Sequence, residues 1–215
     1  MKRKSTRSVD WAKEILPLFK EYKGKKHPLE YQNPFQLVVM TLLAAQDSDR
    51  HINAIAPALF QAIPSMSDLA KKKPEDVFKH VETVRNFWNK TKWLIATAQS
   101  VGEDSKIPTT MEELTKLSGI GRKSANVIKR ELGAPAEGII VDLHVVRVAP
   151  RIGIASGSVP DKIEKQLMEI FPKRQWGEVG MAMSFLGREV CRPTNPNCSA
   201  CVMNKVCAYY KAMKK

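Results

Sequence analysis

Apolar residues recur at helical spacing along almost the whole chain, and this periodicity limits the possible folds more than any other feature. The pattern predicts helices over residues 9–22, 35–46, 48–63, 67–72, 75–84, 89–101, 123–132, 143–151, 159–171 and 175–190. Thr110 and Glu113 have the spacing of a capping box, which predicts a further helix start. The one β-branched run, Gly138 to Val141, is too short to build a sheet. The sequence therefore predicts an all-α fold.

The apolar stretches are too short for a membrane-spanning helix. The longest are Leu37 to Met40 and Leu42 to Ala45, well below the ~20 residues that a membrane-spanning helix needs. The N-terminal segment is charged and lacks the apolar core of a signal peptide. With 43% hydrophobic and 27% charged residues, the composition is that of a globular protein. We therefore expect neither an integral membrane protein nor a secreted one.

Positive charge gathers at the two ends of the chain, which has a formal net charge of +13. Residues 1–28 contain nine Lys or Arg against three acidic residues, and residues 191–215 contain five and no acid. The intervening segment is nearly neutral. Such a distribution indicates either a surface that binds a polyanion or a surface that keeps the protein in solution.

All four cysteines lie close together near the C-terminus, in the spacing C-x6-C-x2-C-x5-C. They are Cys191, Cys198, Cys201 and Cys207. Without a secretory context, four clustered thiols indicate a metal site, and both zinc and a [4Fe–4S] cluster accept four thiolates. Zinc ribbons usually have two close cysteine pairs, whereas this chain has one, so the spacing favours an iron–sulfur cluster.

Residues 117–124, with the sequence LSGIGRKS, form a glycine-rich turn between two predicted helices. The glycines at 119 and 121 permit backbone conformations that point N–H groups outward at the start of the next helix, which suits a phosphate. The alternative is an ordinary turn between helices. Lys123 is accordingly either a phosphate contact or a solvated lysine.

Asp142 follows the apolar run Ile139 to Val141, at the start of a predicted helix. Its carboxylate can cap that helix, or it can support a nearby lysine or a developing positive charge, and one side chain can do both. His144 has no further ligands at suitable spacing, so we interpret it as a packing or hydrogen-bonding residue.

Together, LSGIGRK, VDLH and the cysteine cluster resemble the helix-hairpin-helix DNA glycosylase superfamily, and within it the bacterial endonuclease III family. The resemblance is continuous from about residue 30 to 210. It implies a two-lobed all-α fold. One lobe is a six-helix barrel with the helix-hairpin-helix, here residues 29–136, and the other is a discontinuous helical domain, residues 1–28 and 137–215, whose four cysteines ligate a [4Fe–4S] cluster.

The resemblance also implies an enzyme of base-excision repair. Such an enzyme removes damaged, oxidised pyrimidines from double-stranded DNA and cleaves 3′ to the abasic site through a lysine Schiff base. Lys123 aligns with the Schiff-base lysine and Asp142 with the essential aspartate. The expected partner is duplex DNA that contains a damaged base or an abasic site, bound by a monomer. The expected location is the bacterial cytoplasm, at the nucleoid.

Further DNA contacts follow by position in the family. Gly119, Gly121 and Arg122 belong to the phosphate-binding hairpin, and Gln46 aligns with a glutamine that enters the space left by the flipped nucleotide. The family usually has a Gly-Leu-Tyr segment with a wedge leucine, where this chain has Arg-Asn-Phe-Trp at 85–88. Phe87 or Trp88 replaces the wedge, unless both pack into the barrel.

Two other functions remain open. One is a related glycosylase that acts on uracil or on a mismatched base, because the altered segment at 85–88 concerns lesion choice. The other is a non-catalytic DNA-binding protein, which would need neither Lys123 nor Asp142.

Overall fold

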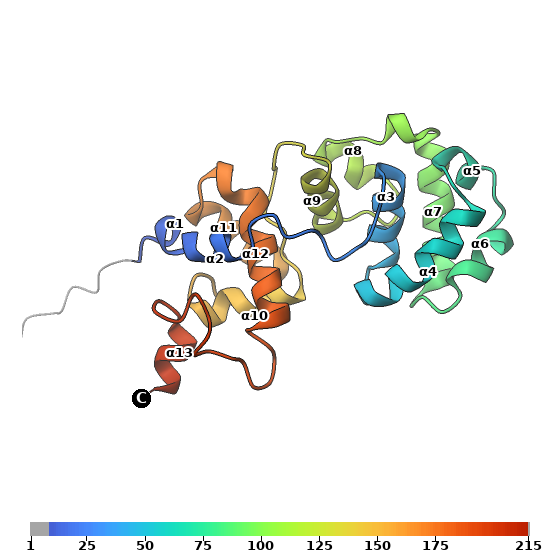
Figure 1. The fold of residues 1–215 in the computed structure, drawn as a ribbon. Coiled ribbons are helices and arrows are strands. Elements are labelled where there is room, and N and C mark those ends of the chain that lie inside the picture. The colour runs from blue at the N-terminus through green and yellow to red at the C-terminus, as the bar shows by residue number, and fades with distance from the viewer. Residues whose placement is uncertain (1–8, 215) are drawn as a thin grey trace, which may run out of the picture. The chain divides into compact units, whose positions relative to one another are not determined.

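The computed structural model describes residues 9–214, and every regular element in that range is helical. The basic residues among positions 1–8 and Lys215 lie outside the described residues. The chain divides into two compact units (Figure 1). Unit 1 comprises residues 1–25 and 136–215, and unit 2 comprises residues 26–135. The resemblance implied boundaries after residues 28 and 136, and the assignment of a barrel domain and a cluster domain stays a prediction.

Unit 2 is built around α3, which is buried on nearly all sides. Its elements are α3 (Pro34–Leu43), α4 (Asp49–Ala62), α5 (Met66–Ala70), α6 (Pro74–Val81), α7 (Phe87–Val101), η1 (Asp104–Lys106), α8 (Met111–Lys116) and α9 (Arg122–Glu131). Helix α3 packs against α4, α7 and α9, and α7 packs against α5 and α6 (Figure 1). Their apolar side chains form one continuous core. This core supports the turns that join α3 to α4, α6 to α7, and α8 to α9.

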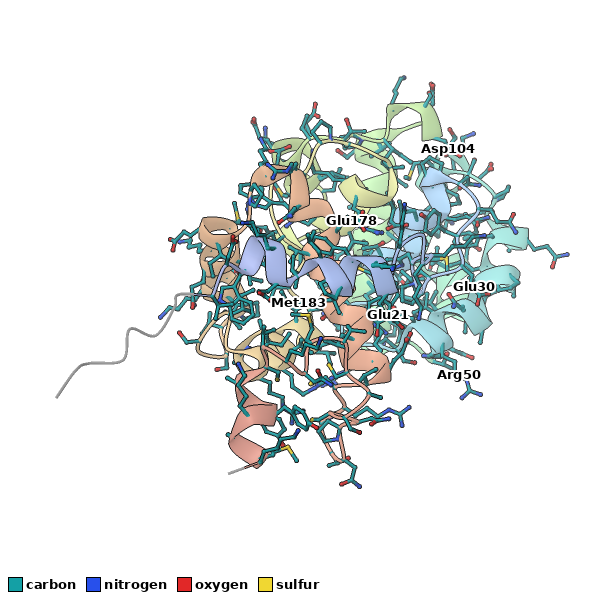
Figure 2. All side chains as sticks on the ribbon, turned by 60° about the vertical axis from the view of Figure 1, so that its left-hand side comes forward. Glu21, Glu30, Arg50, Asp104, Glu178 and Met183 are labelled. Atoms are coloured by element: carbon teal, nitrogen blue, oxygen red, sulfur yellow. The ribbon has the colours of Figure 1, made fainter. Side chains whose placement is uncertain are left out.

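Unit 1 is organised around α12, whose middle is fully buried. Its elements are α1 (Trp11–Glu14), α2 (Leu16–Glu21), α10 (Leu143–Ile152), α11 (Pro160–Ile170), η2 (Lys173–Gln175), α12 (Trp176–Glu189) and α13 (Ala208–Met213). Helix α12 packs against α10 and α2, and Met183 lies inside the unit (Figure 2). A Cβ at Gly180 would come within 2.3 Å of the Ile140 carbonyl oxygen. Glycine at this position therefore lets the segment that leads to Asp142 lie directly on α12.

The observed helices confirm the predicted all-α class, with differences at particular ends. The predicted helix over 9–22 is interrupted at Ile15, because Pro17 has no amide hydrogen and its ring crowds the carbonyl one turn earlier. The predicted helix over 35–46 ends at Leu43. No strand forms at 138–141 or elsewhere among the described residues, and the described chain contains no helix long and apolar enough to span a bilayer.

Candidate active site

The hairpin between α8 and α9 is anchored to α7. Gly119 has a φ of +78°, and a Cβ there would lie 2.9 Å from the indole of Trp93. Thr97, also on α7, donates a hydrogen bond to the Ser118 carbonyl at 3.1 Å. Ile120 is only 4% exposed and packs into the core of unit 2. Both the backbone conformation and the close indole therefore require glycine at 119.

The hairpin leads directly into α9, whose start is exposed and positively charged. Gly121 is the N-cap, and Arg122 and Lys123 are the exposed first residues of the helix. The first turn contains no acidic side chain. Backbone N–H groups at a helix N-terminus and nearby cations together favour an anion such as a phosphate. The hairpin and the start of α9 therefore suit a bound phosphate, which is the role predicted from the sequence.

His27 lies in the electrostatic surroundings of Lys123. Burial is the main cause that lowers the pKa of His27 to about 4, and the positive charge of Lys123 lowers it further. The charges of Glu131 and Asp49 act in the opposite direction. The ring nitrogen Nδ1 accepts a hydrogen bond from the Leu29 amide at 3.1 Å. His27 is therefore neutral at physiological pH, and it was not singled out by the sequence analysis.

Asp142 caps α10, so the capping interpretation is confirmed. Its Oδ1 accepts hydrogen bonds from the backbone amides of His144 and Val145, both at 2.9 Å. Its Oδ2 accepts a hydrogen bond from the Ser184 hydroxyl at 2.6 Å, and the Arg188 guanidinium lies 3.7 Å away. The carboxylate is half-buried and fixed from both α10 and α12. This rigidity suits an electrostatic role as well as a capping role.

The two expected catalytic residues belong to different units. Lys123 lies in unit 2 and Asp142 in unit 1, and their joint action stays a prediction. Ser184 and Arg188 hold the carboxylate from α12, and neither residue was expected from the sequence. No local pattern could have identified them, since only the packing of α12 on α10 brings them to Asp142.

Two further segments from the sequence analysis form exposed turns of unit 2. Gln46 lies between α3 and α4, and Asn86 immediately precedes α7. Both have a φ of 60°, the left-handed region. Asparagine tolerates this conformation better than most residues, whereas for glutamine it costs about 1–2 kcal/mol. Gln46 is thus an exposed, strained residue, outside the helix in which it was expected.

The aromatic residues that follow Asn86 differ in exposure. Phe87 is half-buried, contacts the core of unit 2 and packs edge-on against Phe78 with ring centroids 5.7 Å apart. Trp88 is 56% exposed, although its ring also contacts Phe78 at 4.2 Å between centroids. The expectation of packing into the barrel therefore describes Phe87 better than Trp88, and a DNA contact by Phe87 stays a prediction.

The four cysteines line one pocket of unit 1, with apolar walls that include Ile152, Leu186 and Val190. All four carry free thiols. The described residues contain no group of side chains placed to hold a single metal ion. Four thiols that line one pocket form a donor set that fits a four-thiolate metal centre, and an iron–sulfur cluster is one such centre.

Comparisons with known proteins agree with this arrangement. Residues 39–173 match the HhH-GPD superfamily of base excision DNA repair proteins. The chain is 34% identical over 208 residues to endonuclease III of Synechocystis sp., with 95% of each chain covered. It is 35% identical over 184 residues to endonuclease III of Bacillus subtilis, with 83% of each chain covered.

Solved structures give the same result. A non-covalent endonuclease III–DNA complex is similar with a TM-score of 0.84 and 29% identity, covering 97% of this chain and 100% of the other. A trapped endonuclease III–DNA covalent intermediate is similar with a TM-score of 0.85 and 28% identity, with the same coverage. The resemblance inferred from LSGIGRK, VDLH and the cysteine spacing is thereby confirmed.

Proposed function

The chain belongs to the HhH-GPD superfamily of base excision DNA repair proteins, and we propose that it is a DNA glycosylase with abasic-site lyase activity. It removes oxidised pyrimidines from double-stranded DNA and acts as a monomer. The observation that carries this proposal is Lys123, an amine at the exposed start of α9, directly after a hairpin suited to phosphate. Because DNA is the substrate, we place its action at the bacterial nucleoid in the cytoplasm.

Substrate binding begins at the DNA backbone. The exposed N-terminus of α9, Gly119, Gly121 and Arg122 bind a phosphate beside the lesion. A base within a duplex is unreachable, so it must rotate out of the stack at a cost of a few kcal/mol, least for a poorly stacked lesion. Gln46, exposed on its turn, enters the space that the nucleotide leaves, and Phe87 or Trp88 contacts the opposite strand.

Lys123 then acts as the nucleophile. Its neutral amine attacks the anomeric carbon, the bond to the damaged base breaks, and the base leaves with the bonding electron pair and takes up a proton. The nitrogen then loses a proton and the sugar ring opens: the bond between the anomeric carbon and the ring oxygen breaks, the ring oxygen takes up a proton, and an imine to Lys123 forms. This imine acidifies the adjacent sugar carbon, whose deprotonation expels the 3′ phosphate and cleaves the strand. A lysine attacks only as a free amine, a form that neighbouring positive charge favours. Arg122 and the positive end of α9 supply such charge.

Asp142 supports this step electrostatically. The attack generates positive charge on the sugar, and a carboxylate held by fixed donors stabilises such charge without reorganising. The donors are the two amides of α10 and the hydroxyl of Ser184. Asp142 therefore combines the capping role with a catalytic one.

We further propose that Cys191, Cys198, Cys201 and Cys207 hold a [4Fe–4S] cluster. The support is their common pocket, together with Arg151, whose Nη1 lies 3.7 Å from the Cys191 sulfur and 2.7 Å from the Arg192 carbonyl oxygen. Such a cluster, when bound, would cross-link the segment 191–207 within itself, between the end of α12 and the start of α13. Absorption near ~400 nm and iron in place of zinc in metal analysis would support this assignment, whereas one zinc per chain would contradict it.

A second candidate is a glycosylase for uracil or mismatched bases. The observation that favours it is the turn at 85–88, where Arg85 and Asn86 are exposed in place of the family's usual wedge segment. Lesion choice depends on contacts made around the extruded base, and this turn differs in charge and shape.

One experiment tests the function and separates the candidates. The protein is incubated with duplexes that contain thymine glycol, uracil, a G·T mismatch or a preformed abasic site, and borohydride is added. Reduction of the imine leaves a stable protein–DNA cross-link. We expect cross-links with thymine glycol and with the abasic site. Cross-linking with uracil or the mismatch instead would favour the second candidate, and binding with neither a cross-link nor release of any base would indicate a non-catalytic protein.

A further inference from the structure

Two exposed turns of unit 2 are joined by side chains that the reaction above does not use. The first turn is residues 44–48, between α3 and α4, and the second is residues 82–86, between α6 and α7. Each contains a strained residue, Gln46 in the first and Asn86 in the second. A left-handed conformation at a non-glycine residue persists only where its surroundings enforce it, and such residues cluster at functional sites.

The carboxylate of Asp47 bridges the two turns. Asp47 directly follows Gln46, and its Oδ2 accepts a hydrogen bond from the Arg85 amide of the second turn at 3.0 Å. Its Oδ1 lies 2.9 Å from Nδ1 of His51, whose Nε2 lies 3.0 Å from the Thr83 hydroxyl of the second turn. Burial by itself raises the pKa of Asp47, but the hydrogen bonds from Arg85 and His51 bring it below its usual value. The bridge is therefore a charged carboxylate at neutral pH.

A buried lysine enforces the first turn from the other side. Lys90 lies one helical turn after Asn86, is 2% exposed, and donates hydrogen bonds to the carbonyls of Leu43 at 2.7 Å and Ala45 at 2.6 Å. These carbonyls lie at the end of α3, where a cation is favoured. Burial lowers the pKa of Lys90, and the charge of Asp47 opposes this effect, so the two charges lie close enough to interact.

A lysine is an unusual choice for this position. Lysine is almost never fully buried unless it is paired, because removing the ammonium group from water is costly. A methionine of similar length would fill the same space without that cost. Lys90 therefore does something that packing alone does not require, namely to set the path of the chain into Gln46.

We propose that Lys90 and Asp47 are positioning residues that hold the two turns as one rigid surface, which contacts duplex DNA and keeps an extruded nucleotide out of the stack. This inference rests on the proposed function. A loop that first had to become ordered on DNA would lose conformational entropy, whereas a preorganised pair of turns does not. The exposed side chains suit the task, because Gln46 can hydrogen-bond bases and Arg85 carries positive charge. Arg50, just after the first turn, extends outward from the surface (Figure 2).

The test compares Lys90→Met with Lys129→Met. Lys129 is a matched control, because it is 3% exposed, lies in the same unit and donates to the Thr109 carbonyl at 2.6 Å. Each variant is trapped with borohydride on a duplex with thymine glycol and on a single strand with an abasic site. The single strand has no base pair to open. A 2-aminopurine opposite the lesion reports extrusion by its fluorescence.

We expect Lys90→Met to lose about 10–100-fold in trapping rate on the duplex, with a smaller 2-aminopurine signal, while its rate on the single strand stays that of the unmodified protein. Asp47→Asn keeps the side-chain volume and loses the charge, so it should show the same pattern with a smaller loss. This second variant decides the matter if Lys90→Met does not fold.

Three results would overturn the proposal. They are an unchanged duplex rate in both variants, an equal loss on duplex and single strand in folded protein, and a loss in Lys129→Met that equals the loss in Lys90→Met. Failure of the unmodified protein to cross-link to either substrate contradicts the proposed function itself, and it is recognised before any variant is compared.

Discussion

Lys123 differs from the buried lysines of unit 2 in the exposure of its side chain. Lys90 and Lys129 are buried against carbonyls, whereas Lys123 is exposed at the start of α9. We predict that Lys123→Gln abolishes borohydride trapping and strand cleavage, because no amine remains to form the imine. Affinity for lesion DNA should change little, since the hairpin backbone is intact.

The matched control for this change is Lys106→Gln, an exposed lysine of η1 that is paired with Glu103. It should cross-link like the unmodified protein. A trapped complex of Lys123→Gln at the original rate would mean that another amine is the nucleophile.

The charge of Asp142 and its capping of α10 can be tested separately, because asparagine keeps the cap and removes the charge. Asparagine caps helices about as well as aspartate, so Asp142→Asn should keep α10. Its amide nitrogen cannot accept from Ser184 or pair with Arg188, so the melting temperature should fall modestly. The substitution removes the negative charge, and we expect a loss of about a hundredfold or more in base excision. The check is single-turnover excision beside thermal unfolding. A large fall in melting temperature would instead assign Asp142 a mainly structural role.

His27 makes stability depend on pH. Its pKa falls from the usual 6.5 of an unfolded chain to about 4 in the folded protein, mainly through burial. As the pH drops from 6.5 towards 4, the unfolded chain takes up a proton that folded His27 does not, so the free energy of unfolding decreases. The expected contribution, present above pH 6.5 and lost by pH 4, is about 3 kcal/mol.

The variant His27→Asn keeps an acceptor for the Leu29 amide but cannot become protonated. Urea unfolding at several pH values should therefore show a shallower decrease for the variant over this range. An identical pH dependence in both proteins would show that His27 does not account for the loss.

At the level of elements, the hairpin contains two glycines, and only one of these positions requires glycine. Gly119 has a positive φ and a close indole, whereas Gly121 has a φ of −87° and nothing within 4 Å of an added Cβ. We predict that Gly119→Ala lowers the free energy of unfolding by at least about 1–2 kcal/mol, the cost of the left-handed conformation, since Trp93 must also move.

Gly121→Ala is the control and should lower the free energy of unfolding by less than about 1 kcal/mol, the difference between glycine and alanine at an N-cap. Urea unfolding measures both values. Equal destabilisation by the two substitutions would contradict the role assigned to Trp93.

At the level of the whole molecule, most of the described basic residues of the two ends lie in unit 1, and the hairpin lies in unit 2. If these regions together neutralise four to six phosphates, log K for DNA should fall with log salt concentration at a slope of roughly −4 to −5. Fluorescence anisotropy with labelled duplex between low and moderate salt measures the slope. A slope near zero would show that the charge serves only to keep the protein in solution.

Features that depend on neighbours within a few residues could be predicted from the sequence. The amphipathic helices, the glycine turn before Lys123 and the cap at Asp142 are of this kind, because each depends on backbone geometry and hydrogen bonds over one or two helical turns. The cysteine spacing likewise predicted a common site, since four thiols so close in the chain cannot lie far apart in space. The HhH-GPD family followed from the same motifs.

Only the tertiary structure decided which distant side chains hold these local features in place. Ser184 reaches Asp142 because α12 packs on α10, and Trp93 crowds Gly119 because α7 passes beside the hairpin. Lys90 is the clearest case. Lysine side chains are usually exposed to solvent, yet the packing of α7 on α3 buries Lys90 against the carbonyl of Leu43, the last residue of α3. Such contacts join residues far apart in the chain, and local periodicity carries no information about them.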